Sequence, residues 1–181
     1  MKLMIASDIH GSARWCREML QRFAEEKADR LLLLGDILYH GPRNDLPEEY
    51  APKQVIAMLN ERKNVLCCVR GNCDTEVDQM VLEFPILSDF SVIPVGKRLL
   101  YATHGHHNGE TNPPPLCQGD LLLCGHTHVP KCADHGSFIY LNPGSVSIPK
   151  EGSCHSYMTL EDGTFLWKNV ETGEEYRSFT P

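Results

Sequence analysis

Leu31-Leu32-Leu33-Leu34-Gly35-Asp36 is the stretch that decides the fold. The run of leucines is continuous, which predicts a strand buried on both faces, as in a parallel sheet with helices outside. Gly35 permits a sharp turn where the strand stops. Asp36 then stands at the end of that strand. The stretch therefore predicts an α/β fold with a carboxylate at one edge of its sheet.

The segments around this strand alternate between strand and helix. Residues 2–7 and 65–69 are further short apolar runs. Between the runs, apolar residues recur at helical spacing in 13–24 and again in 53–62. The order strand, helix, strand, helix, strand predicts parallel pairs with right-handed crossovers.

The second half of the chain is predicted to be mostly strands. Gly96-Lys97 and Asp162-Gly163 are typical of hairpin turns, and one helical turn is expected near 114–118. We expect a second sheet packed on the first, with helices outside, in one domain over residues 1–181. The expected strands are 92–95, 99–103, 121–124, 138–141, 157–160 and 165–170.

Composition and charge exclude several classes of function. The formal charge of −7 argues against a broad nucleic-acid surface, which needs clustered Lys and Arg. No apolar stretch approaches the roughly 20 residues that span a bilayer, and the first strand leaves no room for a signal peptide. We therefore expect a cytoplasmic protein without a membrane partner.

The eight cysteines do not suggest a thiolate zinc site, because none forms a Cys-x-x-Cys pair. Disulfides are not expected without a secretion signal. Cys67, Cys68 and Cys124 lie in apolar runs and are predicted to be core residues.

Potential metal ligands follow the apolar runs in five clusters. Each cluster stands at the end of a predicted strand, the edge where α/β folds gather their ligands. Any one cluster is commonly a turn, but their joint occurrence predicts a centre with mixed oxygen and imidazole ligands for divalent ions. The clusters are Asp8-Ile9-His10, Gly35-Asp36, Gly71-Asn72-Cys73-Asp74, Thr103-His104-Gly105 and Gly125-His126-Thr127-His128.

The order of these clusters resembles the calcineurin-like metallophosphoesterase superfamily. Three further segments, 40–44, 70–74 and 142–150, resemble a bacterial phosphodiesterase branch of that superfamily, and the similarity thins out after about Ser153. The resemblance implies a four-layer α/β/β/α sandwich. It also implies two divalent ions, Mn²⁺ in the first place, with Fe, Zn, Ni or Co as alternatives.

By the same resemblance, the two ions share one ligand. One ion takes Asp8, His10, Asp36 and His128. The other takes Asp36, Asn72, His104 and His126. A hydroxide held between two ions about 3.5–4 Å apart would attack phosphorus in line with the leaving oxygen.

Cys73 departs from the superfamily pattern, in which a histidine protonates the leaving group. A thiol with a reference pKa near 8.5 is a much weaker acid than imidazolium, so we expect aryl-type diesters with good leaving groups to react best. His40 and His106 are candidates for a replacement acid. Asp74 is expected to orient a ligand.

Arg43 and Arg70 are candidates for binding phosphate oxygens, since guanidinium suits that geometry. Residues 142–147 are expected to form a supporting turn beneath the site.

Other functions stay open at this point. A phosphomonoesterase or nuclease of the same superfamily is the enzymatic alternative to a small-molecule phosphodiesterase. A binding scaffold like the retromer subunit of this fold is the alternative from another class. Full occupancy of the ligand positions argues against the scaffold. The resemblance also leaves a homodimer or homotetramer open.

Overall fold

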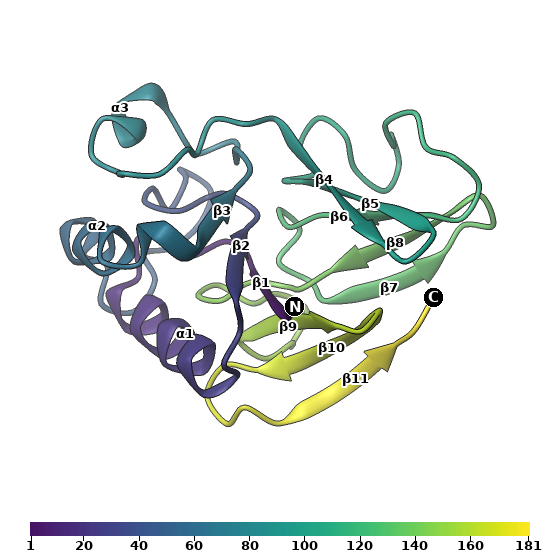
Figure 1. The fold of residues 1–181 in the computed structure, drawn as a ribbon. Coiled ribbons are helices and arrows are strands. Elements are labelled where there is room, and N and C mark those ends of the chain that lie inside the picture. Colours follow the sequence, from purple (N-terminus) through teal and green to yellow (C-terminus); the bar gives the residue numbers. More distant parts are fainter.

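The first strands of the chain and its last strands share one sheet (Figure 1). The computed structural model describes residues 1–181. As predicted, β1 (Leu3–Ala6), β2 (Arg30–Leu33) and β3 (Leu66–Cys68) pair in parallel. Three antiparallel strands complete this six-stranded sheet in the order β11-β10-β9-β1-β2-β3; they are β9 (Ser156–Glu161), β10 (Thr164–Asn169) and β11 (Glu175–Phe179).

The second sheet has five strands in the order β4-β5-β6-β8-β7. The two predicted hairpins are confirmed, because Val95 pairs with Arg98 and Glu161 pairs with Thr164. β7 escapes prediction from the sequence because its residues form no apolar run. The strands are β4 (Phe90–Val95), β5 (Arg98–Thr103), β6 (Asp120–Leu123), β7 (Lys131–Asp134) and β8 (Phe138–Asn142).

The expectation that the second-half strands form one separate sheet is wrong for β9, β10 and β11. β9 pairs antiparallel with the free edge of β1, with Ile5 opposite Met158. An alternating strand pattern specifies a buried face but does not name the strand it pairs with. The chain's two ends are thus held in one sheet.

Two helices, α1 (Ala13–Glu25) and α2 (Pro52–Asn60), pack on the outer face of the six-stranded sheet (Figure 1). The 3₁₀ turn η1 (Lys63–Val65) leads into β3, and the short α3 (Glu76–Gln79) has no buried residue and lies away from the sheet. Ser12 begins α1 by accepting a hydrogen bond from the Trp15 amide. The α/β class with two mixed sheets is confirmed.

The outer face of the five-stranded sheet is covered by a non-helical segment. The helical turn expected near 114–118 does not form there. Leu116 instead packs on the outward-facing side chains of Leu122, Phe138 and Tyr140. The prolines of this segment favour extended backbone and remove helical N–H donors.

One core lies between the helices and the outer face of the six-stranded sheet, and another lies between the two sheets. Leu32, Leu123 and Trp167 are among the buried side chains of the core between the sheets. Cys67 faces the same side as its neighbour Leu32, yet it is exposed. The prediction that Cys67 is a core residue is wrong because β3 is the edge strand, where the opposite sheet no longer covers it. No helix combines the length and the apolar character needed to cross a bilayer.

Glu26 fastens the end of α1 to the sheet. Its carboxylate lies 2.7 Å from Lys2 Nζ and 2.6 Å from Lys168 Nζ, and it accepts a 2.8 Å hydrogen bond from the Tyr157 hydroxyl. Burial alone would raise the pKa of Glu26, but these three donors lower it to about 2.

Replacing Glu26 with Gln is expected to destabilise the protein by about 2 kcal/mol near neutral pH, because charged hydrogen bonds are lost. A depressed folded-state pKa contributes stability above the ordinary value of 4.5, and that contribution disappears as the pH falls toward about 2. Denaturant unfolding at pH 7 and pH 3 should show the difference between variant and wild type shrinking at the lower pH. An equal difference at both pH values would contradict this.

Candidate metal centre

The strand ends bring all the predicted metal ligands together at one edge of the sandwich. β1 and β2 lead into Asp8, His10 and Asp36, and β3 leads into Asn72. β5 ends immediately before His104. β6 leads into His126 and His128. Convergence of parallel strand ends from two sheets therefore builds the site, as the sequence pattern indicates.

The backbone at these positions is unusual. Five of the predicted ligands have left-handed φ angles between 49° and 65°, namely Asp8, His10, Asp36, His126 and His128. Non-glycine residues adopt this region rarely and at a cost. Concentration of such residues at one edge of the fold is typical of a functional site rather than of ordinary turns.

The first ligand group consists of Asp8, His10 and His128. Nε2 of His10 lies 3.2 Å from Nε2 of His128. Asp8 Oδ1 lies 3.6 Å from His10 Nε2 and 3.2 Å from His128 Nε2. Nδ1 of His10 donates to the Tyr39 carbonyl at 2.7 Å. Nδ1 of His128 donates to the Ile148 carbonyl at 2.7 Å. Each ring thus turns an unprotonated Nε2 toward the other, and such lone pairs repel unless a cation lies between them.

The second ligand group consists of Asn72, His104 and His126. His104 Nε2 lies 3.0 Å from Asn72 Oδ1 and 3.2 Å from His126 Nδ1. His104 Nδ1 donates to the Leu34 carbonyl at 2.6 Å, so its Nε2 is the atom that faces Asn72 and His126. As in the first group, donor atoms this close to one another need a positive charge among them, which a metal ion can supply.

Asp36 lies between the two groups. Its Oδ2 is 3.7 Å from His10 Nε2 and 3.5 Å from His104 Nε2. Its Oδ1 accepts a 2.8 Å hydrogen bond from the Cys73 amide, which fixes the carboxylate. A carboxylate in this place can serve both groups at once.

The electrostatics of the cluster fit a cation. Asp8 is fully buried, and its Oδ1 has no hydrogen-bond partner. Burial alone would raise its pKa, but His10 and His128 hold the pKa of Asp8 well below its usual range. Burial would likewise lower the pKa of His104, yet Asp36 raises it to about 9. The two carboxylates thus draw positive charge, and the chemistry of the donors suits divalent metal ions.

Asp74 supports the site from below. Its carboxylate accepts hydrogen bonds from the backbone amides of Gly71, Asp36 and Ile37 at 2.7, 2.8 and 2.9 Å. A side chain on Gly71 would place its Cβ 2.2 Å from Asp36 Oδ1. The Asp74 carboxylate therefore ties the loop of Gly71 to the loop of Asp36, and glycine is the residue that the close approach of the two loops permits.

The turn at 142–147 lies beneath Asp8, as expected. The hydroxyls of Ser145 and Ser147 both donate to the Asp8 carbonyl at 2.9 Å. Asn142 Nδ2 donates to the Gly125 carbonyl at 2.7 Å and so holds the loop that carries the His126 ligand. This segment supports the ligands and does not face the substrate pocket.

Cys73 points its thiol at the centre. Its Sγ, His10 and Asp36 have donor atoms within 4.8 Å of one another, and Asn72 Nδ2 donates to the thiol at 3.3 Å. Burial raises the pKa of Cys73, and the Asp36 carboxylate raises it further. The thiol therefore stays protonated and is a weak acid.

The two other candidate acids differ in position. The His40 ring packs edge-on against Tyr39 and Tyr50, with centroids 4.8 and 5.2 Å away, and it is not part of the pocket wall. His106 lies 5.4 Å from the His104 ring. Burial and the neighbouring His104 lower the pKa of His106 to about 4. His106 is therefore a neutral imidazole at pH 7 and is not an evident general acid.

A pocket of about 330 Å³ opens over the two ligand groups. Asp36, Asn72, His126 and His128 form part of its floor, and Arg43 lies in its wall, as expected for a substrate-binding residue. Lys150 and Thr127 also line the pocket and were not expected. No spacing or motif in the sequence marks a lone loop lysine as a pocket residue. The remaining lining residues are Gly41, Pro42, Asn44 and Cys73.

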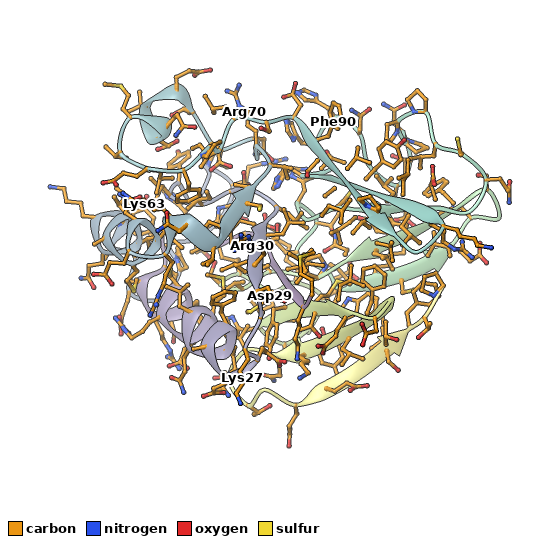
Figure 2. The ribbon with its side chains drawn as sticks, viewed as in Figure 1. Lys27, Asp29, Arg30, Lys63, Arg70 and Phe90 are labelled. Atoms are coloured by element: carbon orange, nitrogen blue, oxygen red, sulfur yellow. The ribbon has the colours of Figure 1, made fainter.

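Arg70 lies elsewhere. Its Nε donates to the Asp74 carbonyl at 3.2 Å, and its guanidinium lies 3.4 Å from the Glu76 carboxylate. Figure 2 shows Arg70 near the top of the view, above β3. There it lines a separate cavity of about 350 Å³ together with His106 and Asn72. Arg70 is therefore a weaker candidate for phosphate binding than Arg43.

Comparison with known proteins identifies, over most of the chain, the superfamily that the sequence motifs resemble. Residues 1–163 match the calcineurin-like phosphoesterase superfamily domain. The chain is 51% identical over 162 residues to the phosphodiesterase YfcE of Escherichia coli K12, covering 90% of this chain and 88% of that protein. It is 25% identical over 171 residues to the probable metallophosphoesterase YsnB of Bacillus subtilis, covering 90% and 86%.

Solved structures show the same architecture. The YfcE phosphoesterase structure from E. coli superimposes with a TM-score of 0.95 at 46% identity, covering 99% of both chains. Vacuolar Protein Sorting 29 from Cryptosporidium parvum matches with a TM-score of 0.61 at 16% identity, covering 99% of this chain and 98% of that one. The second likeness concerns the fold alone.

Proposed function

The chain belongs to the calcineurin-like phosphoesterase superfamily, and on that premise we propose that it is a metal-dependent phosphodiesterase, a hydrolase of phosphoester bonds. One observation carries the proposal. Two groups of metal-ligand side chains face each other across Asp36 at the floor of an open pocket. The 51% identity to a protein named a phosphodiesterase supports the choice of reaction.

We assign one divalent ion to each ligand group, with Asp36 shared by both. The first ion would take the side chains of Asp8, His10 and His128, and the second those of the Asn72, His104 and His126 group. Mixed carboxylate, amide and imidazole donors suit Mn²⁺, Fe²⁺ and Zn²⁺. We propose Mn²⁺ first, from the resemblance to the bacterial branch, with Fe, Zn, Ni or Co as alternatives.

When bound, these ions would supply an activated water and positive charge against the phosphate oxygens. The protein's part is to hold the donors in place. The carbonyls of Tyr39, Leu34 and Ile148 keep three imidazoles in the Nδ1–H form, so that Nε2 faces inward. Asn72 contributes an uncharged oxygen, which leaves the centre with a net positive charge for an anionic substrate.

Among diesters, we propose that those with good leaving groups, such as aryl esters, react best. The protonated Cys73 thiol is the weak acid nearest the centre. Apart from Pro42 and the Cys73 thiol, the pocket wall offers an aryl ring little apolar surface. Preference for aryl esters would therefore come from the leaving oxygen and not from binding of the ring.

The direct test uses bis(p-nitrophenyl) phosphate and p-nitrophenyl phosphate with added Mn²⁺. We expect the diester to be hydrolysed at least about tenfold faster in kcat/KM, because it offers the same leaving group with less negative charge to neutralise. Faster hydrolysis of the monoester would favour the phosphomonoesterase alternative. No turnover of either with any of the five metals would favour the non-catalytic scaffold.

Several expectations from the sequence stay predictions. These are the location in the cytoplasm, the homodimer or homotetramer, and the treatment of residues 1–181 as one domain. The shared sheet of β1 and β9 supports the last of them, since both chain ends are needed to build it.

A further inference from the structure

Two cationic side chains stand at the rim of the pocket without an acidic partner. Arg43 and Lys150 both line the pocket, and both are exposed. Neither takes part in any ion pair of the structure, although most ion pairs here use a lysine or an arginine. Both side chains are therefore free to meet an anion in this polar pocket.

Both residues sit on backbone that is fixed to the metal centre. Arg43 belongs to the turn at 41–44, where Asn44 Nδ2 donates to the His40 carbonyl at 2.8 Å. Gly41 of that turn lies so close that a Cβ there would be 3.3 Å from Cys73 Sγ. The rim is therefore anchored on this side by the turn itself.

Lys150 is anchored from the opposite wall. The Lys150 amide donates to the His128 carbonyl at 3.3 Å. The Lys150 carbonyl accepts a 2.7 Å hydrogen bond from the Ser153 hydroxyl. The backbone of Lys150 is thus hydrogen-bonded to the loop that carries His128, and its exposed side chain extends from this anchored backbone.

The rim and the floor are different places. The donors that draw a cation, Asp8, His10 and Asp36, are buried, whereas the two cations are at the open end. A volume of about 330 Å³ falls in the range of pockets that hold whole small ligands, about 300–1,000 Å³. A scissile phosphate on the floor therefore leaves room for a further part of the substrate at the rim.

We propose that Arg43 and Lys150 bind a second phosphate group, carried on one arm of the diester whose bridging phosphate is cleaved on the floor. The substrate class is then a phosphodiester with a phosphomonoester on the same arm. This inference rests on the proposed function. A guanidinium binds phosphate through paired N–H donors, and an ammonium adds a point charge. Apart from Pro42 and the Cys73 thiol the pocket lining is polar, which argues against an apolar arm at this position.

Two chromogenic diesters test the proposal. One is the p-nitrophenyl ester of thymidine 5′-phosphate, and the other is the same compound with an added 3′-phosphate. They share the leaving group and differ only in the second phosphate. We expect the Mn²⁺-loaded enzyme to prefer the second by about tenfold in kcat/KM, since exposed charged contacts are each worth little. The preference should fall as salt is raised.

The variant Arg43→Gln/Lys150→Gln should bring the ratio of the two kcat/KM values close to one. Lys97→Gln is the matched control, because Lys97 is exposed in the turn before β5, at the opposite end of that strand from His104. It should leave the ratio unchanged.

Three outcomes would overturn the inference. One is a wild-type ratio near one. Another is a double variant that loses both activities equally, which would mean that the cations clamp the cleaved phosphate. The third is a ratio that survives the double variant. If neither compound is hydrolysed with any divalent metal, the proposed function itself fails, so the two failures are distinguishable.

Discussion

Asp36→Asn is expected to lower kcat/KM for bis(p-nitrophenyl) phosphate by about 10²–10³-fold, more than the 10–100-fold typical of residues that only orient metal ligands. Asp36 Oδ2 lies 3.7 Å from Nε2 of His10 in one ligand group and 3.5 Å from Nε2 of His104 in the other. The amide has the same shape and can still accept from the Cys73 amide, but it removes a negative charge that the centre needs to hold divalent ions.

The fold should survive this change. The new amide keeps the size of the carboxylate but loses its attraction for His104, whose pKa Asp36 raises to about 9. We therefore expect the metal-free variant to keep its fold and to lose some thermal stability. Asp120→Asn is the matched control, since Asp120 is a buried aspartate that accepts from the Leu99 and Cys117 amides at the start of β6, away from the centre.

The control should retain activity within about twofold, as expected for a change remote from the chemistry. Steady-state kinetics with metal content determined on the same samples decide the matter. An Asp36→Asn enzyme within a few-fold of wild type would contradict the shared role of this carboxylate.

Cys73→His is expected to change which esters react, and not simply how fast. A positioned general acid contributes about 10²–10⁴-fold when the leaving group needs a proton. We expect kcat/KM for alkyl diesters, whose alkoxides leave poorly, to rise by about 10–100-fold. Aryl diesters should change by less than about threefold, because their leaving oxygen needs little help.

The structure has room for the imidazole. Cys73 lines the pocket over the metal centre and also a second, apolar cavity of about 400 Å³ on its other side. Cys73→Ser is the control, since a hydroxyl is also a weak acid and should give no gain with alkyl esters. The measurement is the slope of log kcat/KM against leaving-group pKa. An identical slope for wild type and Cys73→His would show that position 73 does not act on the leaving group.

The ligand set is the part of the site that sequence reasoning predicts best. Every predicted ligand follows an apolar run, and parallel strands deliver their carboxyl ends to one edge whatever the details of packing. The supporting turn at 142–147 follows the same logic, because it leads out of β8 on the same edge. The left-handed backbone at Asp8 and His10 has no signal of its own in the residue types.

What the sequence does not predict depends on contacts between distant segments. The placement of β9 beside β1 is a choice of partner, which strand patterns do not encode. Exposure of Cys67 follows from its place on an edge strand. Lys150 becomes a pocket residue only because the loop after the 142–147 turn returns to His128.

The most direct test of the two-ion centre is metal content together with activity on chelator-treated wild-type protein. Mn²⁺ is added back in steps, and bound ions and hydrolysis of bis(p-nitrophenyl) phosphate are measured on the same samples. The account predicts no hydrolysis after chelation and full recovery at two bound ions per chain. Recovery at one bound ion, or hydrolysis that persists without metal, would contradict it.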